Sequence, residues 1–232
     1  MSSGGVRRSA YQRVLDRVGA AIVSGELEAG SVISVDALVD LTGASRSIVR
    51  EATRVLASVG LLTARPKVGL RIADRRDWDA LDSDIVRWRL DSPQRSEQIA
   101  ELLELRLAIE PAAAQSAARR RTDDQAAELV AAGEQLRAAA SLRDGAAFFD
   151  ADARFHGLVT TASENRMFAR LQSVLREALR ERTPREPFTW DDAPADVDLH
   201  VALADAIDQR DPDGARDLMS LIVRGDRAHA QR

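Results

Sequence analysis

Residues 38–65 read LVDLTGASRSIVREATRVLASVGLLTAR, and this stretch decides the fold of the N-terminal third of the chain. The pattern predicts a helix, a tight turn at Thr42 and Gly43, a second helix that begins after Ser45, and the first strand of a hairpin. This order of elements is typical of a winged helix-turn-helix, a fold that reads DNA.

The second predicted helix has a basic face and an apolar face. At 100° per residue, Arg46, Arg50 and Arg54 fall within an arc of about 80°, with Ser47 beside them. Ser45 suits the N-cap because its hydroxyl can accept a backbone N–H. The opposite face carries apolar residues suited to packing: Ile48, Val49, Ala52, Val55, Leu56 and Val59. We expect the basic face to meet phosphates and base edges.

A basic hairpin follows this helix. Residues 61–63 and 70–72 read as two short strands, and Arg65 and Lys67 lie near the tip between them. Such a hairpin makes a wing that can reach a neighbouring groove of DNA. The alternative is a surface helix whose arginines are merely solvated. The turn, the hairpin and the basic tip together favour the DNA-reading interpretation.

Composition limits the class of protein. The chain has 232 residues, 45% of them apolar, which suits one large or two small domains. It has no cysteine, which excludes disulfides, thiolate zinc sites and cysteine nucleophiles. The N-terminus lacks the apolar core of a signal peptide, and no run of apolar residues is long enough to span a bilayer. We therefore expect a cytoplasmic protein with no membrane partner.

Charge is distributed unevenly and predicts two domains. Residues 1–76 hold 12 Lys and Arg against 7 Asp and Glu, which leaves 21 against 30 for residues 77–232. A basic N-terminal part joined to an acidic remainder is the pattern of a DNA-binding domain with a second domain of different function. Beyond the wing the periodicity is helical, and the predicted helices are 79–90, 93–121, 122–143, 145–162, 164–182, 196–209 and 212–230, with a proline-bearing loop at 183–195. The predicted fold class is mainly α: a winged helix-turn-helix of three helices and a hairpin over 1–76, and an antiparallel α-helical bundle over 77–232.

Asp152 and His156 form the first candidate site of the predicted bundle. They are four residues apart, so they project from one side of a helix at a spacing that suits two ligands of one metal ion. His200, on another predicted helix, can supply a third ligand. The alternative is an ordinary ion pair on the edge of the helix.

Arg106 and Asn165 form the second candidate site. A guanidinium binds a carboxylate through two parallel hydrogen bonds, and an amide can complete the clamp. The alternative for Arg106 is an ion pair with one of the neighbouring acidic residues, Glu101, Glu104 or Glu110.

Several segments resemble a known family in order and spacing. Residues 22–27 (IVSGEL), 30–31 (GS), 45–52 (SRSIVREA) and 60–62 (GLL) resemble the DNA-binding domain of the GntR family of bacterial transcription regulators. Residues 104–110 (ELRLAIE), 155–156 (FH), 162–165 (ASEN) and His200 resemble the all-helical effector domain, the FCD domain, of its FadR-type branch. Residues 81–89 are similar to the joining segment of regulators that respond to sugar acids such as galactonate.

The resemblance implies a homodimer on a palindromic operator and a metal-containing effector cavity. It places DNA reading at Ser45, Arg46, Ser47 and Arg50 with Gly69 near the DNA backbone, a divalent metal such as zinc at Asp152, His156 and His200, and the effector at Arg106 and Asn165. The chain departs from the family pattern at Ile222, where a further histidine ligand is usual. It also departs at Asp36, near which many relatives carry an arginine.

The functional expectation is a ligand-responsive repressor of organic-acid catabolism genes. A small carboxylate such as an aldonic or hydroxy acid would release it from the operator. One alternative is a metal-dependent enzyme acting on a small organic acid and carrying a DNA-binding module, although the sequence shows no HExxH pattern and no familiar nucleophile motif. Another is an architectural DNA-binding dimer whose bundle serves only for association.

Overall fold

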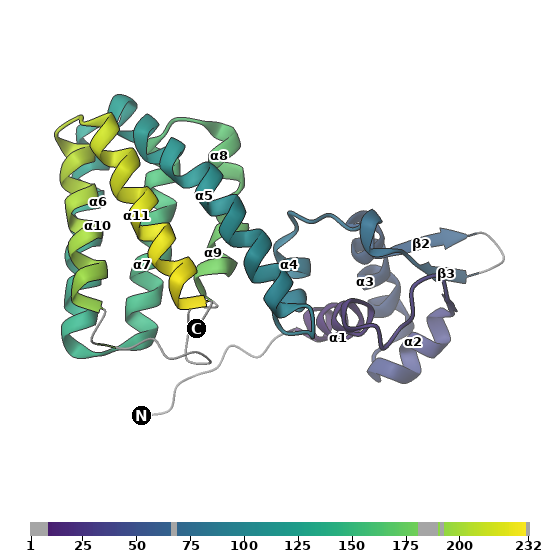
Figure 1. Ribbon diagram of the computed structural model, residues 1–232. Coiled ribbons are helices and arrows are strands. Elements are labelled where there is room, and N and C mark those ends of the chain that lie inside the picture. The colour runs from purple at the N-terminus through teal and green to yellow at the C-terminus, as the bar shows by residue number, and fades with distance from the viewer. Residues whose placement is uncertain (1–8, 66–68, 181–189, 191–192, 231–232) are drawn as a thin grey trace. The chain divides into compact units, whose positions relative to one another are not determined.

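The computed structural model describes residues 9–65, 69–180, 190 and 193–230, which belong to two compact units, 1–98 and 99–232. The N-terminal unit combines helices with a small sheet, and the C-terminal unit is helical (Figure 1). Within the described part of the chain, none of the helices combines the length and the apolar character that a bilayer crossing requires.

The N-terminal unit contains the predicted winged helix-turn-helix. Gly43 ends the first helix of the motif with a φ of 65°, and the Ser45 side chain caps the second by accepting the Ile48 N–H. In chain order the elements are α1 (Ala10–Ser24), β1 (Val32–Ile33), α2 (Val35–Thr42), α3 (Arg46–Ser58), β2 (Leu62–Arg65), β3 (Gly69–Ile72), the 3-10 helix η1 (Arg75–Asp77) and α4 (Ser83–Leu90).

The wing is an antiparallel sheet with the strand order β1-β3-β2. The predicted hairpin is confirmed, because Leu62 pairs with Ile72 and Arg65 with Gly69. Strand β1 pairs with the outer side of β3 and was not predicted. Two residues are too few to show the alternation by which a strand is recognised in a sequence.

Helix α4 packs within the N-terminal unit. Trp88 is only 4% exposed and belongs to the same apolar cluster as Val18 and Leu56. Its indole lies so close to Gly19 of α1 that a Cβ there would be 2.3 Å from a ring carbon. The compact unit therefore ends after Gln98, whereas the sequence placed the boundary after residue 76.

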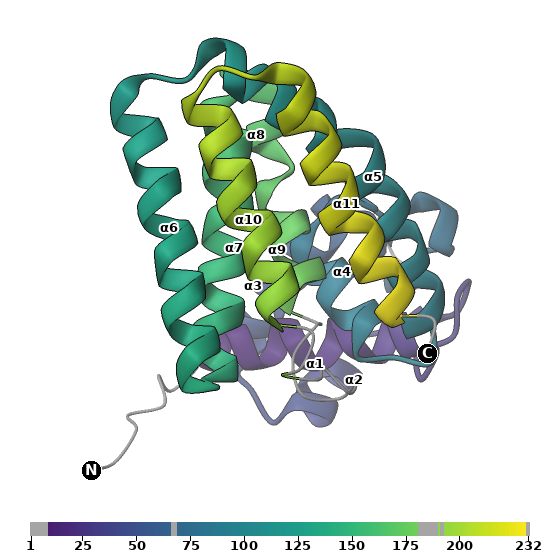
Figure 2. The ribbon, with the colours of Figure 1, turned by 60° about the vertical axis from the view of Figure 1, so that its left-hand side comes forward.

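The C-terminal unit is a helical bundle. Figure 2 shows its long helices side by side, and the connections of two or three residues at 121–122, 143–144 and 209–211 make the helices that they join antiparallel. Its elements are α5 (Arg95–Arg120, which begins just before the boundary), α6 (Asp123–Leu142), α7 (Gly145–Ala162), α8 (Arg166–Arg170), α9 (Gln172–Arg180), α10 (Ala193–Asp208) and α11 (Pro212–Ala230). Together with the winged unit, this bundle confirms the predicted fold class.

Two predicted boundaries in the bundle are corrected. The helix expected over 164–182 is split into α8 and α9, and Asn165 caps α8 by accepting the Met167 N–H. The helix expected from residue 196 begins at Ala193. Most of the predicted loop, residues 183–189 and 191–192, lies outside the described residues.

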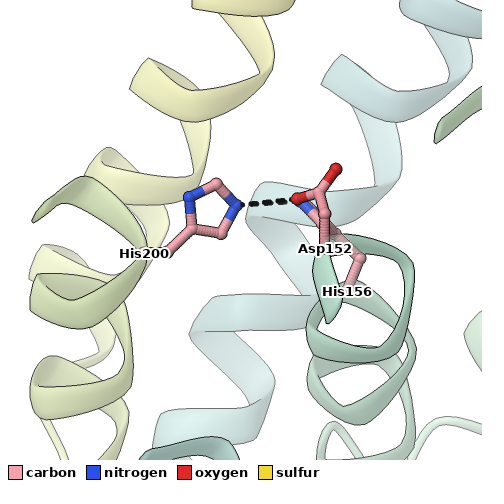
Figure 3. A group of neighbouring side chains, drawn as sticks. All are labelled: Asp152, His156 and His200. Atoms are coloured by element: carbon pink, nitrogen blue, oxygen red, sulfur yellow. Dashed lines mark hydrogen bonds and ion pairs between the residues drawn. The ribbon is translucent and has the colours of Figure 1, made fainter. Parts of the chain in front are cut away.

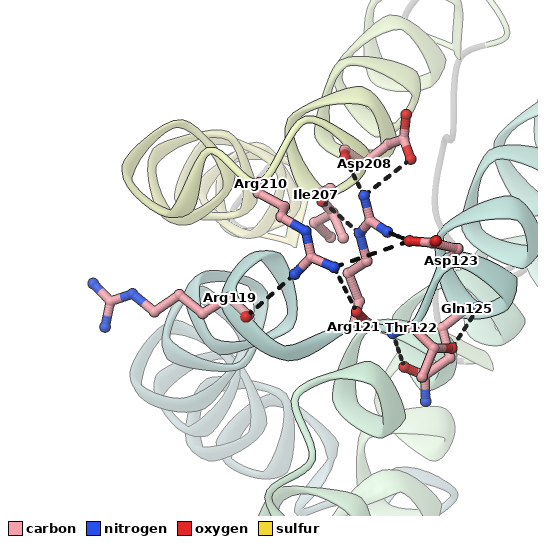
Figure 4. A network of polar contacts seen from close by, with 8 residues as sticks. All are labelled: Arg119, Arg121, Thr122, Asp123, Gln125, Ile207, Asp208 and Arg210. Atoms are coloured by element: carbon pink, nitrogen blue, oxygen red, sulfur yellow. Dashed lines mark hydrogen bonds and ion pairs between the residues drawn. The ribbon is translucent and has the colours of Figure 1, made fainter.

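Two arginines join the end of α5 to the end of α10 (Figure 4). Arg121 donates to the carbonyl oxygens of Ile207 and Asp208, while Arg210 donates to the carbonyl oxygens of Arg119 and Arg121. Helix C-termini leave carbonyl oxygens without partners inside the helix. Each arginine supplies partners for the end of the opposite helix, which fixes the two ends to each other.

Candidate functional site

Helix α3 presents the predicted basic face to solvent. The side chains of Arg46, Arg50 and Arg54 are exposed, whereas Val49 and Leu56 are fully buried. Val55, expected on the packed face, is 37% exposed and lies at its margin. Ser45 and Ser47 stand together at the start of the helix, with 3.0 Å between their hydroxyl oxygens. The structure thus gathers the predicted reading residues on one open surface.

Asp36 alters this surface. Its carboxylate, at the start of α2, forms an ion pair with the guanidinium of Arg46, and the two side chains are 61% and 63% exposed. An acidic group beside an arginine both orients that arginine and opposes the approach of phosphates. The sequence identified Asp36 as a departure from the family pattern but not as the partner of Arg46.

The wing supplies the remaining predicted residues. Arg65 is the last residue of β2, and Lys67 lies outside the described residues. Gly69 has a φ of 120°, and a Cβ there would lie 3.1 Å from the Ile33 carbonyl oxygen. Glycine is therefore needed at this position for the backbone conformation and for the approach of β1, whatever its distance from DNA.

The predicted metal ligands lie together inside the bundle (Figure 3). Asp152 and His156 come from α7 and His200 from α10, and each is at most 2% exposed. Helix α7 brings its pair inward because Phe148 and Phe155 are buried on the adjoining face. The pair is thus not the exposed ion pair on a helix edge that the sequence also allowed.

The distances among the donor atoms suit one small cation. His200 Nε2 lies 3.1 Å from Asp152 Oδ1, His156 Nε2 lies 3.4 Å from the same oxygen, and the two Nε2 atoms are 3.4 Å apart. Ligands placed about 2.1 Å from a tetrahedral zinc ion are about 3.4 Å from each other. One carboxylate oxygen and two imidazole nitrogens also match the donor types that zinc prefers. The donor set therefore fits a divalent metal.

Both histidines present Nε2 to this point because their Nδ1 atoms face other acceptors. His200 Nδ1 lies 2.7 Å from the backbone oxygen of Asp196. His156 Nδ1 lies 2.6 Å from Glu110 Oε2, although the angle of this contact is less favourable than its distance. An acceptor at Nδ1 keeps the proton there and leaves the Nε2 lone pair available.

The electrostatics of the cluster favour positive charge. Burial acts to lower the pKa of His156, but Glu110 and Asp152 outweigh it and raise the pKa to about 9. Burial likewise acts to lower the pKa of His200, and Asp196 and Asp152 raise it above its ordinary value. For Glu110, burial acts to raise the pKa, and Arg106 and His156 lower it to about 2. The surrounding carboxylates therefore stabilise positive charge on the two imidazoles.

Arg106 is connected to this cluster through Glu110. It is 1% exposed, its Nε donates to Glu110 Oε1 at 2.7 Å, and its Nη2 donates to Oε2 at 3.4 Å. The alternative of an ion pair is thus realised with Glu110, but inside the bundle rather than on its surface. Asn165, the other predicted effector residue, caps α8.

Sequence reasoning missed Glu110 as part of the site. It was one of three acidic neighbours considered for Arg106, and the i, i+4 spacing singled it out only weakly. Ile222 of α11, where the family pattern has a further histidine, is 1% exposed and belongs to the apolar core of the helical unit.

An open arginine-faced winged helix joined to a helical unit with a buried carboxylate–imidazole cluster defines a ligand-responsive, DNA-binding transcription regulator. Comparison with known proteins identifies the family. Residues 10–72 match the bacterial regulatory proteins of the gntR family, and residues 101–225 match the FCD domain. The chain therefore belongs to the GntR family, whose members are regulators rather than enzymes.

Individual relatives agree with this assignment. The chain is 32% identical to the galactonate operon transcriptional repressor of Escherichia coli over 209 residues, covering 88% of this chain and 89% of that one. It is 33% identical to the putative L-lactate dehydrogenase operon regulatory protein of E. coli over 227 residues, covering 91% and 83%. The fold is also similar to that of Lar from Listeria monocytogenes, with a TM-score of 0.66 at 17% identity over 98% of this chain and 99% of that one.

Proposed function

We propose that this regulator is a homodimeric repressor that binds a palindromic operator and is released by a small hydroxy acid bound beside a divalent metal. The observation that carries the proposal is the buried triangle of Asp152, His156 and His200 inside the effector domain of a DNA-binding regulator. A buried group of this kind needs a cation to offset its desolvation.

The donor set favours zinc. Asp152, His156 and His200 would hold the ion, and Ile222 leaves the site with three protein ligands. Three protein ligands leave a coordination position open to an oxygen of a second molecule. When bound, the metal supplies a positive charge that attracts such oxygens.

A hydroxy acid matches the chemistry of the site and the names of the relatives. Galactonate is an aldonic acid and lactate is a 2-hydroxy acid, so both compounds in those names carry a carboxylate beside a hydroxyl group. These are hard oxygen donors that suit an open metal position. We place the carboxylate near Arg106 and Asn165, because a guanidinium and an amide donate to carboxylate oxygens.

Release of DNA requires unequal binding. An effector shifts the regulator away from the operator only if its affinity for the DNA-free form exceeds its affinity for the DNA-bound form. Operator and effector must then weaken each other by the same factor.

A thermal-shift screen of aldonic, uronic and hydroxy acids, with and without chelator, tests the proposal. We expect at least one acid to raise the Tm only in the metal-loaded protein, and the same acid to weaken binding to duplexes selected from a random library. His200→Ala should abolish both effects, and the exposed Asp205→Ala on the same helix should preserve them. Sedimentation of the protein with a selected duplex tests the dimer.

Two results would contradict the proposal. If chelation, His200→Ala and every acid leave DNA affinity unchanged, the bundle serves association rather than sensing. If the purified protein consumes an acid catalytically and His156→Ala stops it, the site belongs to an enzyme.

A further inference from the structure

We propose that Glu110 is a positioning residue for the metal ligand His156, and that Arg106 holds Glu110 in place for this task. The inference rests on the metal part of the proposed function. It assigns Glu110 a role that the sequence motifs did not indicate, and it gives Arg106 a role apart from effector binding.

The two oxygens of Glu110 face different partners. Oε1 accepts from Arg106 Nε at 2.7 Å, and Oε2 lies 2.6 Å from His156 Nδ1. All three side chains are at most 2% exposed, so water does not compete for these contacts. The carboxylate therefore links a fixed cation on α5 to the imidazole on α7.

His200 shows why such a link is needed. Its Nδ1 lies 2.7 Å from the Asp196 backbone oxygen, an acceptor fixed by the helix that carries both residues. His156 meets instead a side chain from another helix, and a carboxylate on a rotatable stem can turn away. The bidentate approach of Arg106 restricts that rotation. The Arg106–Glu110 pair thus does for His156 what the backbone does for His200.

A carboxylate behind a metal-bound histidine affects metal affinity. It fixes the proton on the distal nitrogen, orients the ring and increases the basicity of the ligating nitrogen. Loss of such a partner lowers metal affinity by about 10-fold to 100-fold in other proteins. We expect a loss in this range for Glu110→Gln, which keeps the shape of the side chain and removes its charge.

Titration with Co²⁺, followed by its visible absorption and by chelator competition, measures the affinity directly. Glu104→Gln is the matched control, because Glu104 is exposed on the same helix and undergoes the same charge change. Glu110→Gln alone removes a negative charge that Arg106 contacts inside the bundle, so the charge-neutral double variant Arg106→Gln/Glu110→Gln is measured beside it. We expect both Glu110 variants to bind Co²⁺ at least 10-fold more weakly and the control to match the unaltered protein.

Heteronuclear NMR of the unaltered, cadmium-loaded protein tests the geometry without any substitution. Coupling of cadmium to His156 Nε2, with the proton on Nδ1, supports the proposal. Coupling to Nδ1 overturns it, as does Co²⁺ affinity within about threefold of the unaltered value in the Glu110 variants. Absence of any Co²⁺ binding by the unaltered protein also overturns it, while operator binding by the chelated protein would leave the regulator assignment intact.

Discussion

Arg50 lies at the centre of the exposed basic arc on α3, between Arg46 and Arg54. A bidentate contact from arginine to a guanine edge contributes about 1–3 kcal/mol of discrimination. We therefore expect Arg50→Ala to weaken binding to a selected operator by about that amount, with less loss on random DNA. Fluorescence anisotropy measures both affinities, and Arg137→Ala, an exposed change in the helical unit, is the control. Equal losses on both DNAs would assign Arg50 to phosphates instead.

For Asp36 we predict a substitution that strengthens DNA binding, whereas Arg50→Ala weakens it. Removing its charge by Asp36→Asn frees Arg46 from its ion pair and removes a negative group from the surface that is predicted to face DNA. We expect tighter binding to random duplex DNA and a salt dependence steeper by about 0.9 in the log–log slope, the value of one added phosphate contact. Asp124→Asn, an exposed change in the helical unit, should leave the slope unaltered. A shallower slope in Asp36→Asn would mean that Asp36 orients Arg46 productively.

His156 makes the stability of the metal-free protein depend on pH. Its pKa is raised from 6.5 to about 9 in the fold, chiefly by Glu110 and Asp152 against the effect of burial. The protonated form therefore contributes stability that is complete below pH 6.5 and is lost as the pH rises through about 9. Chelated protein should show a Tm that falls across this window, and His156→Gln should show a smaller fall. A Tm of the chelated protein that is constant or rises from pH 6.5 to 9 would contradict this account.

At the scale of single elements, α4 docks on α1 through one close approach. The Trp88 ring lies where a Gly19 side chain would be. Gly19→Ala should therefore destabilise the N-terminal unit by about 1–3 kcal/mol, the usual cost of overpacking. Gly225→Ala in α11, where a Cβ meets nothing within 4 Å, should instead be neutral or stabilising by about 0.5–1 kcal/mol. Urea denaturation compares the free energies of unfolding of the two variants. Equal values would show that α4 shifts to accommodate the new side chain at residue 19 without loss of stability.

Elements that carry their own signal were predictable from the sequence. Helix α3 is amphipathic, Thr42 and Gly43 mark its preceding turn, and Ser45 caps it, so local patterns sufficed. The spacing of Asp152 and His156 likewise indicated a shared helix face. Strand β1 has no local signal because it exists through its pairing with β3. The role of Glu110 was hidden for a similar reason, since its partner His156 lies on another helix.

At the scale of the whole molecule, the chain divides into two compact units after Gln98. The uneven distribution of charge predicted a boundary after residue 76, because charged residues lie mostly on the surface. Trp88 belongs to the first unit through its buried packing, which the distribution of charge does not reveal. A fragment of residues 1–98 should therefore unfold cooperatively, and a fragment of residues 1–76, lacking Ile85 and Trp88, should unfold at lower urea concentration. Equal midpoints for the two fragments would show that α4 adds nothing to the fold of the DNA-binding unit.

The paired arginines at the ends of α5 and α10 hold one end of α5 in place and leave the rest of the helix free of these contacts. Helix α5 is 26 residues long, about 39 Å, and contacts of Arg121 and Arg210 fix its C-terminal end. Arg106 lies near the middle of α5, and Arg95 is its first residue. Because the C-terminal end of α5 is fixed and Pro111 lies between that end and Arg106, a displacement at the buried carboxylate cluster would bend α5 near Pro111 and leave its C-terminal end in place.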